Sequence, residues 1–266
     1  MGELINKQRV AESFSKAAST YDNEAALQRD IGHQLLLKLP VDLEVAKSSR
    51  LLDLGCGTGY FTSQLHRMFS ENRLVGLDIA SGMLAHARHH RELGCEVSWV
   101  CGDAESLPLK SQSSSMVFSS LAIQWCENSV ALFSEISRVL QSDGIACLAT
   151  LGPKTLFELR ESWSTVDDYR HVNQFQSMEN LIEALPSDLE VVQSESEMRV
   201  LHYSHLKELT HELKGIGAHN MNAGQAKGLT GPARVKAFRK AYESFRDPQG
   251  YLPASYEVLY LILRKR

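Results

Sequence analysis

The sequence predicts an α/β protein in which a doubly wound parallel sheet carries an α-helical cap, and three observations support this. Short apolar segments alternate with amphipathic ones between residues 49 and 144, a rhythm typical of parallel strands covered by helices on both faces. A glycine-rich turn at 55–59 follows the first apolar segment, where doubly wound folds bind their ligands. After residue 151 the alternation stops and helical periodicity takes over.

The composition is that of an ordinary globular chain and excludes several classes of protein. The chain has 266 residues, of which 43% are hydrophobic and 23% charged, and its formal net charge is -4. These values argue against a disordered or fibrous protein and, because the charge is negative, against a general nucleic-acid binder. No apolar run approaches the ~18 residues needed to cross a bilayer, and no apolar signal segment follows the first charges. We therefore expect a cytoplasmic protein that binds neither nucleic acid nor membrane.

Residues 1–45 are expected to form a helical lid ahead of the sheet. Apolar side chains recur at helical spacing in the first lid helix, at Val10, Phe14, Ala17 and Tyr21. A second helix is expected from Asp22, with an apolar face made of Leu27, Ile31 and Leu35. A lid in this position can fold over the carboxyl edge of the sheet and close a pocket there.

The segment 46–151 is expected to form the core of the fold. Its apolar runs predict strands at 50–54, 74–78, 97–101, 116–121 and 145–150. Its helices are expected from Tyr60, from Gly82 to Leu93 and from Val130 to Leu140. This alternation is the pattern that predicts a parallel sheet with helices on both sides.

Residues 152–250 are expected to form the cap, and 251–266 a final strand that returns to the core. Helical spacing predicts cap helices around 156–166 and 181–185, an extended stretch at 189–201, and a helix that ends near Gly215 and Gly217. A loop rich in Gly and Asn is expected at 215–231. Pro232 then opens a helix whose apolar face is Val235, Phe238 and Tyr242. The apolar run at 258–263 is expected at the edge of the sheet.

The sequence predicts no metal site. The five cysteines include no Cys-x-x-Cys pair and have mostly apolar neighbours, so we expect reduced thiols: Cys56, Cys95, Cys101, Cys126 and Cys147. Three histidines lie close together, at His86, His89 and His90, without the spacing of a metal-binding motif. A solvated helix face explains them better.

The strongest local signal is the strand, turn and helix around Gly55, Gly57 and Gly59. Glycine permits positive φ and lets a ligand approach the backbone without a Cβ in the way. Tyr60 stands where a dinucleotide fingerprint has its third glycine, which disfavours pyrophosphate binding. An NAD- or FAD-dependent enzyme is the alternative interpretation.

Two further turns carry acidic residues at the same predicted edge of the sheet. Asp78 ends the second strand about 20 residues after the glycine turn, where a carboxylate binds ribose hydroxyls in doubly wound folds. The alternative is that Asp78 caps the helix that starts near Ser81. After the third strand, Asp103 can accept the exocyclic amine of adenine and Ala104 offers a backbone donor. Ordinary turn chemistry would also explain this pair.

Together these segments resemble the class I S-adenosylmethionine-dependent methyltransferases. The matching segments are 53–59, Asp78, 102–104, and 138–140 ahead of a strand at Gly144. The resemblance implies a Rossmann-like sheet of seven strands with the last one antiparallel. It also implies that S-adenosylmethionine binds with its methionine end over the glycine turn that follows Asp53, its ribose on Asp78, and its adenine near Asp103 between Ile79 and Ala104.

A narrower resemblance extends almost end to end. The segments 14–22, 121–126, 155–159, 171–175 and 255–258 resemble the malonyl-acyl-carrier-protein O-methyltransferases of biotin synthesis. One departure is the turn at 141–144, Gln-Ser-Asp-Gly, where many members of that family have Pro-Gly. The resemblance implies methylation of the free carboxylate of a malonyl thioester, which lets fatty-acid elongation build the pimeloyl chain.

Such a reaction needs no general base, because a malonyl carboxyl group is already ionised at neutral pH. Catalysis is expected from alignment and exclusion of water. Five residues are expected to form the acceptor site: Tyr21 as its wall, Gln124 to orient the carboxylate, Trp125 to exclude water, and His171 and Asn173 to hydrogen-bond the substrate. Packing or structural roles are the alternative for each of them.

A carrier protein is acidic, so its partner is expected to present a local basic surface. The segment 227–246 has six basic residues and one acidic residue, and Lys236, Arg239 and Lys240 lie away from the apolar face of its helix. We expect these three to dock malonyl-acyl-carrier protein, although a solubilising surface would look the same. The alternatives for the whole chain are a methyltransferase for a small polycarboxylate such as trans-aconitate, and a regulator that binds S-adenosylmethionine without turnover.

Overall fold

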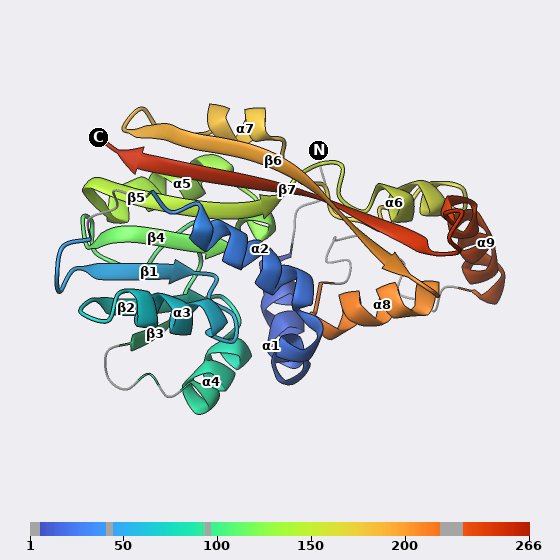
Figure 1. Ribbon diagram of the computed structural model, residues 1–266, viewed down its shortest axis with the longest axis horizontal. Helices are drawn as coiled ribbons and strands as arrows, with labels where there is room; N and C mark the ends of the chain where they lie inside the picture. Colours follow the sequence, from blue (N-terminus) through green and yellow to red (C-terminus); the bar gives the residue numbers. More distant parts are fainter. Residues whose placement is uncertain (1–5, 41–44, 92, 94–96, 219–230) are drawn as a thin grey trace.

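A computed structural model describes residues 6–40, 45–91, 93, 97–218 and 231–266. The described residues form one seven-stranded sheet in the order β3-β2-β1-β4-β5-β7-β6. Its strands are β1 (Arg50–Leu54), β2 (Arg73–Asp78), β3 (Val97–Cys101), β4 (Ser114–Ser120), β5 (Leu140–Leu151), β6 (Leu189–Tyr203) and β7 (Leu252–Lys265). Figure 1 shows this sheet with helices on both sides. The predicted doubly wound α/β fold is confirmed.

The first five strands are parallel to one another, and β7 is the only strand of the described sheet that runs in the opposite direction. β1 pairs with β2 and β4 in parallel register, whereas β7 runs antiparallel to both β5 and β6. β2 and β3 are added on one side of β1, whereas β4 and β5 are added on its other side. The direction in which strands are added therefore reverses between β1 and β4. The carboxyl ends of these two strands mark the switch point where doubly wound folds bind ligands.

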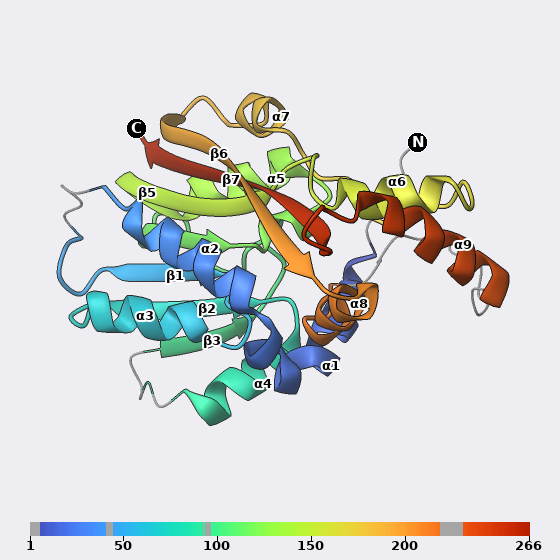
Figure 2. The same cartoon turned by 45° about the vertical axis from the view of Figure 1, so that its right-hand side comes forward.

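Helices cover both faces of the sheet and bury two apolar clusters. One cluster includes Ile31 and Leu35 of α2, and the other includes Phe133 and Ile136 of α5. Figures 1 and 2 show α2 and α3 on one face and α5 and α7 on the other. The helices are α1 (Lys7–Glu24), α2 (Ala26–Leu37), α3 (Tyr60–Met68), α4 (Ser81–His90), α5 (Ser129–Val139), α6 (Phe157–Ser164), α7 (Met178–Glu183), α8 (Leu206–Gly215) and α9 (Pro232–Tyr242). Among the described residues, no helix combines the length and hydropathy needed to span a bilayer.

The two N-terminal helices differ from the prediction at their junction. The second helix does not begin at Asp22, because α1 continues to Glu24 and α2 begins at Ala26. The Asp22 carboxylate cannot cap α2, since it accepts hydrogen bonds from Thr58 and Arg91 instead. The prediction used the local pattern of apolar residues, whereas a tertiary contact of Asp22 accompanies the later start of α2.

Two other element ends differ from the prediction. α4 ends at His90, not at Leu93, because the backbone of Arg91 is extended and its side chain turns to the glycine turn. The turn predicted at 141–144 is part of β5, which begins at Leu140 directly after α5. Asp143 takes a φ of 62° within that stretch, a conformation that Asp tolerates better than most residues.

The last strand is not at the edge of the sheet, as predicted, but second from it. β6 forms the edge and comes from within 152–250, the segment predicted as the cap. Residues 254–263 of β7 are buried throughout, because their apolar side chains alternate between the two clusters on opposite faces of the sheet. Figure 1 shows β6 and β7 extending past the other strands toward α6, α8 and α9. We propose the same division into lid, core, cap and final strand, with one change: the cap segment supplies β6 to the core sheet. Most of the loop predicted at 215–231 lies outside the described residues.

Candidate active site

Two cavities lie at the carboxyl edge of the parallel strands. The smaller one, of about 100 Å³, is lined by the glycine turn, the end of β2 and the turn at 102–104. The larger one, of about 260 Å³, is lined by residues of α6, α8 and the segment 171–175. Both cavities are also lined by Phe14, Tyr21, Leu121 and Trp125, which we call the shared wall. Ligands in the two cavities would therefore meet at this wall.

The glycine turn brings backbone to the surface of the smaller cavity. Gly55 and Gly57 line it and have positive φ, 73° and 52°. A Cβ on Gly55 would lie 2.1 Å from the Cβ of Ala122, whereas one on Gly57 would meet nothing within 4 Å. Gly55 is therefore required by packing, and Gly57 leaves open space for a ligand. Gly59 does not line the cavity and packs against Trp99.

Asp78 lies beside this turn and holds it. Its Oδ2 accepts the Gly57 N–H at 2.8 Å, and its Oδ1 accepts the Ala80 N–H at 2.7 Å. Burial raises the pKa of Asp78, and the backbone hydrogen bonds oppose that rise. Asp78 does not cap α4, whose N-cap residue is Ala80 and has no side-chain cap; it binds the Ala80 N–H in the turn just before that helix. Each carboxylate oxygen keeps a further lone pair that can accept a hydroxyl.

Asp53 lies behind the cavity and does not line it. Thr62 of α3 donates a hydrogen bond to its Oδ2 at 2.5 Å. Burial raises the pKa of Asp53 to about 7. The carboxyl group therefore ties β1 to α3 beneath the glycine turn instead of facing a ligand.

Asp103, Ala104 and Ile79 line the smaller cavity together with Lys7, which the sequence analysis missed. The Lys7 ammonium lies 2.6 Å from the Asp103 carboxylate and 2.7 Å from that of Glu105. Burial would lower the pKa of Lys7, but the hydrogen bonds to these two carboxylates raise it. An adenine amine at Asp103 would therefore share the carboxylate with this lysine.

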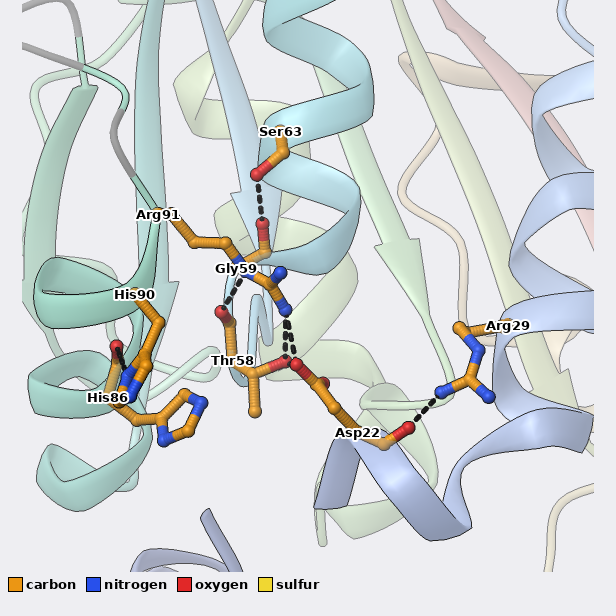
Figure 3. Close-up of polar contacts among 8 residues, drawn as sticks. All are labelled: Asp22, Arg29, Thr58, Gly59, Ser63, His86, His90 and Arg91. Carbon is orange, nitrogen blue, oxygen red and sulfur yellow. Dashed lines mark hydrogen bonds and ion pairs between the residues drawn. The ribbon is translucent and has the colours of Figure 1, made fainter. Parts of the chain in front are cut away.

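Asp22 links α1 to the glycine turn. Figure 3 shows its carboxylate at the centre of a polar cluster, with Thr58 donating at 2.6 Å and Arg91 forming an ion pair. Arg91 also donates to the Thr58 carbonyl at 3.0 Å, and Arg29 donates to the Asp22 carbonyl. This cluster fixes the end of α1 next to the turn and so places Tyr21 in the shared wall.

Gln124 and Trp125 follow β4 and line the larger cavity. The Gln124 amide donates to the Leu121 carbonyl at 2.7 Å and accepts from Thr150 at 3.3 Å. Trp125 packs edge-on against Phe14, with ring centroids 5.3 Å apart. Leu121 has a φ of 54°, the kind of backbone strain that is concentrated at functional sites.

His171 and Asn173 line the same cavity in different ways. The His171 ring lies 3.8 Å from that of Trp163 in a parallel stack, and its Nε2 lies 2.8 Å from Asp167. Burial would raise the pKa of Asp167, but hydrogen bonds from His171, Arg234 and the Tyr169 backbone lower it. Asn173 is 7% exposed, and its Oδ1 has no partner among the described residues.

A second amide in the larger cavity also lacks a partner. The Oε1 of Gln28, a residue of α2, is buried and has no hydrogen-bond partner among the described residues. A buried amide without a partner is costly, so this arrangement favours a ligand that satisfies both amides. By rotating about its last torsion, each amide can offer either its NH₂ group or its oxygen. No sequence signal distinguished Gln28 from its helical neighbours.

The smaller cavity contains a similar group. The Ser120 hydroxyl lines it, is buried, and has no partner among the described residues. With the free lone pairs of Asp78 and the open space above Gly57, it provides hydrogen-bonding capacity for a hydroxyl-rich ligand. These residues fit a nucleoside.

The structure thus brings most of the predicted site residues together. The larger cavity is lined by all five residues predicted for the acceptor site: Tyr21, Gln124, Trp125, His171 and Asn173. The smaller is lined by six of the eight predicted for the cofactor: Gly55, Gly57, Asp78, Ile79, Asp103 and Ala104. The described residues contain no group of three or more His, Cys, Asp or Glu side chains that could hold a metal ion.

Comparisons with known proteins identify methyltransferases as relatives of this chain. Residues 52–148 match a family model described as a methyltransferase domain. A protein of Cellvibrio japonicus named biotin biosynthesis bifunctional protein BioHC is 50% identical over 266 residues, which cover 100% of this chain and 51% of the relative. The chain spans about half the length of this protein and of two other bifunctional relatives.

Shorter relatives match over most of their length. A malonyl-acyl-carrier-protein O-methyltransferase of Hahella chejuensis is 39% identical over 254 residues, covering 96% of this chain and 89% of the relative. One of Laribacter hongkongensis is 40% identical over 264 residues, covering 96% and 88%.

Solved structures share the fold at low identity. An S-adenosylmethionine-dependent methyltransferase from Mesorhizobium loti has a TM-score of 0.54 at 19% identity, covering 88% of this chain and 96% of that one. The 4+2 cyclase SpnF has a TM-score of 0.57 at 21% identity, covering 90% and 81%. Because a cyclase shares this fold, the fold alone does not specify the reaction.

Proposed function

Because this chain belongs to the malonyl-acyl-carrier-protein O-methyltransferase family, we propose that it transfers a methyl group from S-adenosylmethionine to the free carboxylate of a malonyl thioester. The observation that carries the proposal is the pair of cavities that meet at the shared wall. One suits the methyl donor and the other its acceptor. The product would be the malonyl methyl ester that primes pimeloyl synthesis for biotin.

In this proposal the smaller cavity holds S-adenosylmethionine. Asp78 accepts hydrogen bonds from the ribose hydroxyls, Asp103 binds the adenine amine, and the backbone at Gly57 lies against the methionine end. Ile79 and Ala104 flank the adenine ring. When bound, S-adenosylmethionine supplies an electrophilic methyl group on a positively charged sulfur.

The larger cavity would hold the malonyl group. None of its described lining residues is acidic, so it does not repel a carboxylate. The Gln28 and Asn173 amides, whose oxygens have no partner among the described residues, can turn their NH₂ groups to donate to that carboxylate. The aromatic side chains of Tyr21 and Trp125 keep water from it. The chain has to align and desolvate the acceptor, and no proton has to be removed from it.

Malonyl-acyl-carrier protein is the proposed physiological acceptor, with α9 as its docking surface. Lys236, Arg239 and Lys240 are exposed on this helix, and the carrier is acidic. Reversing Lys236 and Lys240 to Glu should raise the KM for malonyl-acyl-carrier protein but not for malonyl-coenzyme A. Equal changes in both KM values would reject the docking surface. Arg239 is left intact in this test because it lines a hollow beside the larger cavity.

A cytoplasmic setting is part of the proposal. The described cysteines, Cys56, Cys101, Cys126 and Cys147, are free thiols, which is compatible with a reducing compartment.

The proposal is tested by offering S-adenosylmethionine with one acceptor at a time and measuring released S-adenosylhomocysteine and product mass. The acceptors are malonyl-acyl-carrier protein, malonyl-coenzyme A, free malonate and trans-aconitate. We expect a methyl ester on the malonyl thioesters. Preference for trans-aconitate would favour a small-acid methyltransferase instead. Tight binding of S-adenosylmethionine without turnover on any acceptor would favour a regulator.

A further inference from the structure

A third hollow lies outside the larger cavity, between α8 and α9. It has a volume of about 210 Å³ and is lined by Leu206, Lys207, Thr210, Val235, Phe238, Arg239 and Trp163. We call it the outer hollow. Lys207, Thr210 and Arg239 are exposed, so the outer hollow is open to solvent. Figure 2 shows α9 at the right-hand end of the molecule, with α8 between it and α1.

Three residues separate the outer hollow from the larger cavity. Trp163, Thr210 and Phe238 line both spaces. The rings of Trp163 and Phe238 are stacked, with centroids 4.2 Å apart and planes at 11°. An elongated ligand that occupies both spaces would therefore pass beside this pair of rings.

The charged side chains that line the two spaces are all basic among the described residues. Lys207 and Arg239 come from different helices and form no ion pair with any described residue. No acidic residue is among the described lining of either space. Lys214 adds a further cation on the same side of α8, where it lines the larger cavity. By contrast, Arg246 just beyond α9 is neutralised by Glu243.

We propose that Lys207 and Arg239 bind the phosphate of the arm that carries the acyl thioester. The inference rests on the proposed function, since a carrier protein and coenzyme A present a thioester on the same phosphate-bearing pantetheine arm. With the malonyl group in the larger cavity, the arm passes Trp163 and Phe238 and its phosphate lies in the outer hollow. Arginine suits this task because its guanidinium can donate two parallel hydrogen bonds to a phosphate.

The test compares acceptors whose pantetheine arm carries a phosphate with one whose arm does not. Lys207→Ala and Arg239→Ala are assayed with malonyl-acyl-carrier protein, malonyl-coenzyme A and malonyl-pantetheine, which lacks the phosphate. Losing a charge-assisted hydrogen bond should lower kcat/KM about tenfold or more for both phosphate-bearing acceptors. The value for malonyl-pantetheine should stay within about twofold of that of the parent protein. Lys110→Ala and Arg67→Ala, which change exposed cations that line none of these spaces, are the matched controls.

Each other outcome overturns the inference. Equal losses with malonyl-pantetheine would mean that the variants disturb the cavity itself. A loss confined to the carrier protein would assign Lys207 and Arg239 to the protein surface contact, and a loss confined to coenzyme A would assign them to its nucleotide phosphates. No change in any variant would mean that the phosphate lies elsewhere. If the proposed function itself is wrong, the parent protein will methylate none of the three acceptors. This result differs from every outcome that overturns only the phosphate site.

Discussion

Replacing Asp78 with Asn tests how the smaller cavity holds its ligand. Asp78 accepts two backbone N–H groups, from Gly57 at 2.8 Å and from Ala80 at 2.7 Å. An asparagine of the same shape carries no charge, and its NH₂ group would face one of these donors. A hydrogen bond to a charged group contributes ~1.5–3 kcal/mol, so we expect the Kd for S-adenosylmethionine to rise about 10- to 100-fold.

The assay is isothermal titration calorimetry of the Asp78→Asn variant with S-adenosylmethionine, alongside its free energy of unfolding in urea. Asp143→Asn makes the same chemical change at an exposed site away from both cavities, where Asn tolerates the positive φ. It should bind like the parent protein. A folded Asp78→Asn variant whose Kd stays within about twofold of the parent value would refute the assignment of ribose to Asp78.

Three further predictions concern other parts of the site. Asn173→Leu should raise the KM for the malonyl thioester about tenfold without changing the Kd for S-adenosylmethionine; an unchanged KM in steady-state assays would remove Asn173 from the acceptor site. Gly55→Ala should lower the free energy of unfolding because its Cβ would collide with Ala122. Gly57→Ala should lower the free energy of unfolding by only about 1–2 kcal/mol, because of its positive φ, yet weaken S-adenosylmethionine binding. A larger loss of stability in Gly57→Ala than in Gly55→Ala, or an unchanged Kd of Gly57→Ala in calorimetry, would contradict this. Because burial raises the pKa of Asp53 from 3.8 to about 7, the folded chain binds that proton more tightly than the unfolded chain. The free energy of unfolding should therefore fall as the pH rises from about 4 to 7. Asp53→Asn should make this fall smaller in urea titrations, and an equal fall in both proteins would contradict the sign.

Much of the fold could be predicted because its signals are local. The apolar runs that form β1 to β5 and the Pro that opens α9 are each visible within a dozen residues. The order of the last strands was not predictable in this way. β6 and β7 pair over almost their whole lengths although a helical segment separates them along the chain. The continuous apolar run at 258–263 was interpreted as an edge strand, although such a run is typical of a strand whose two faces are both buried.

The candidate site likewise contains residues that local spacing indicated and residues that only tertiary contacts reveal. The glycine turn and Asp78 were identified because their spacing along the chain carries the information. Lys7 was missed because its partner Asp103 lies 96 residues away. Gln28 and Ser120 were missed because an unpartnered buried oxygen is a property of the folded chain and not of its sequence. For the same reason, Asp22 was expected to start a helix when it instead joins α1 to the glycine turn.

The most direct test of the two-cavity arrangement is a crystal structure of the chain with S-adenosylhomocysteine. We expect the ribose hydroxyls on the Asp78 carboxylate and the sulfur beside Tyr21 and Trp125, facing the larger cavity. A ligand bound in the larger cavity, or one whose sulfur points away from Tyr21 and Trp125, would contradict the account.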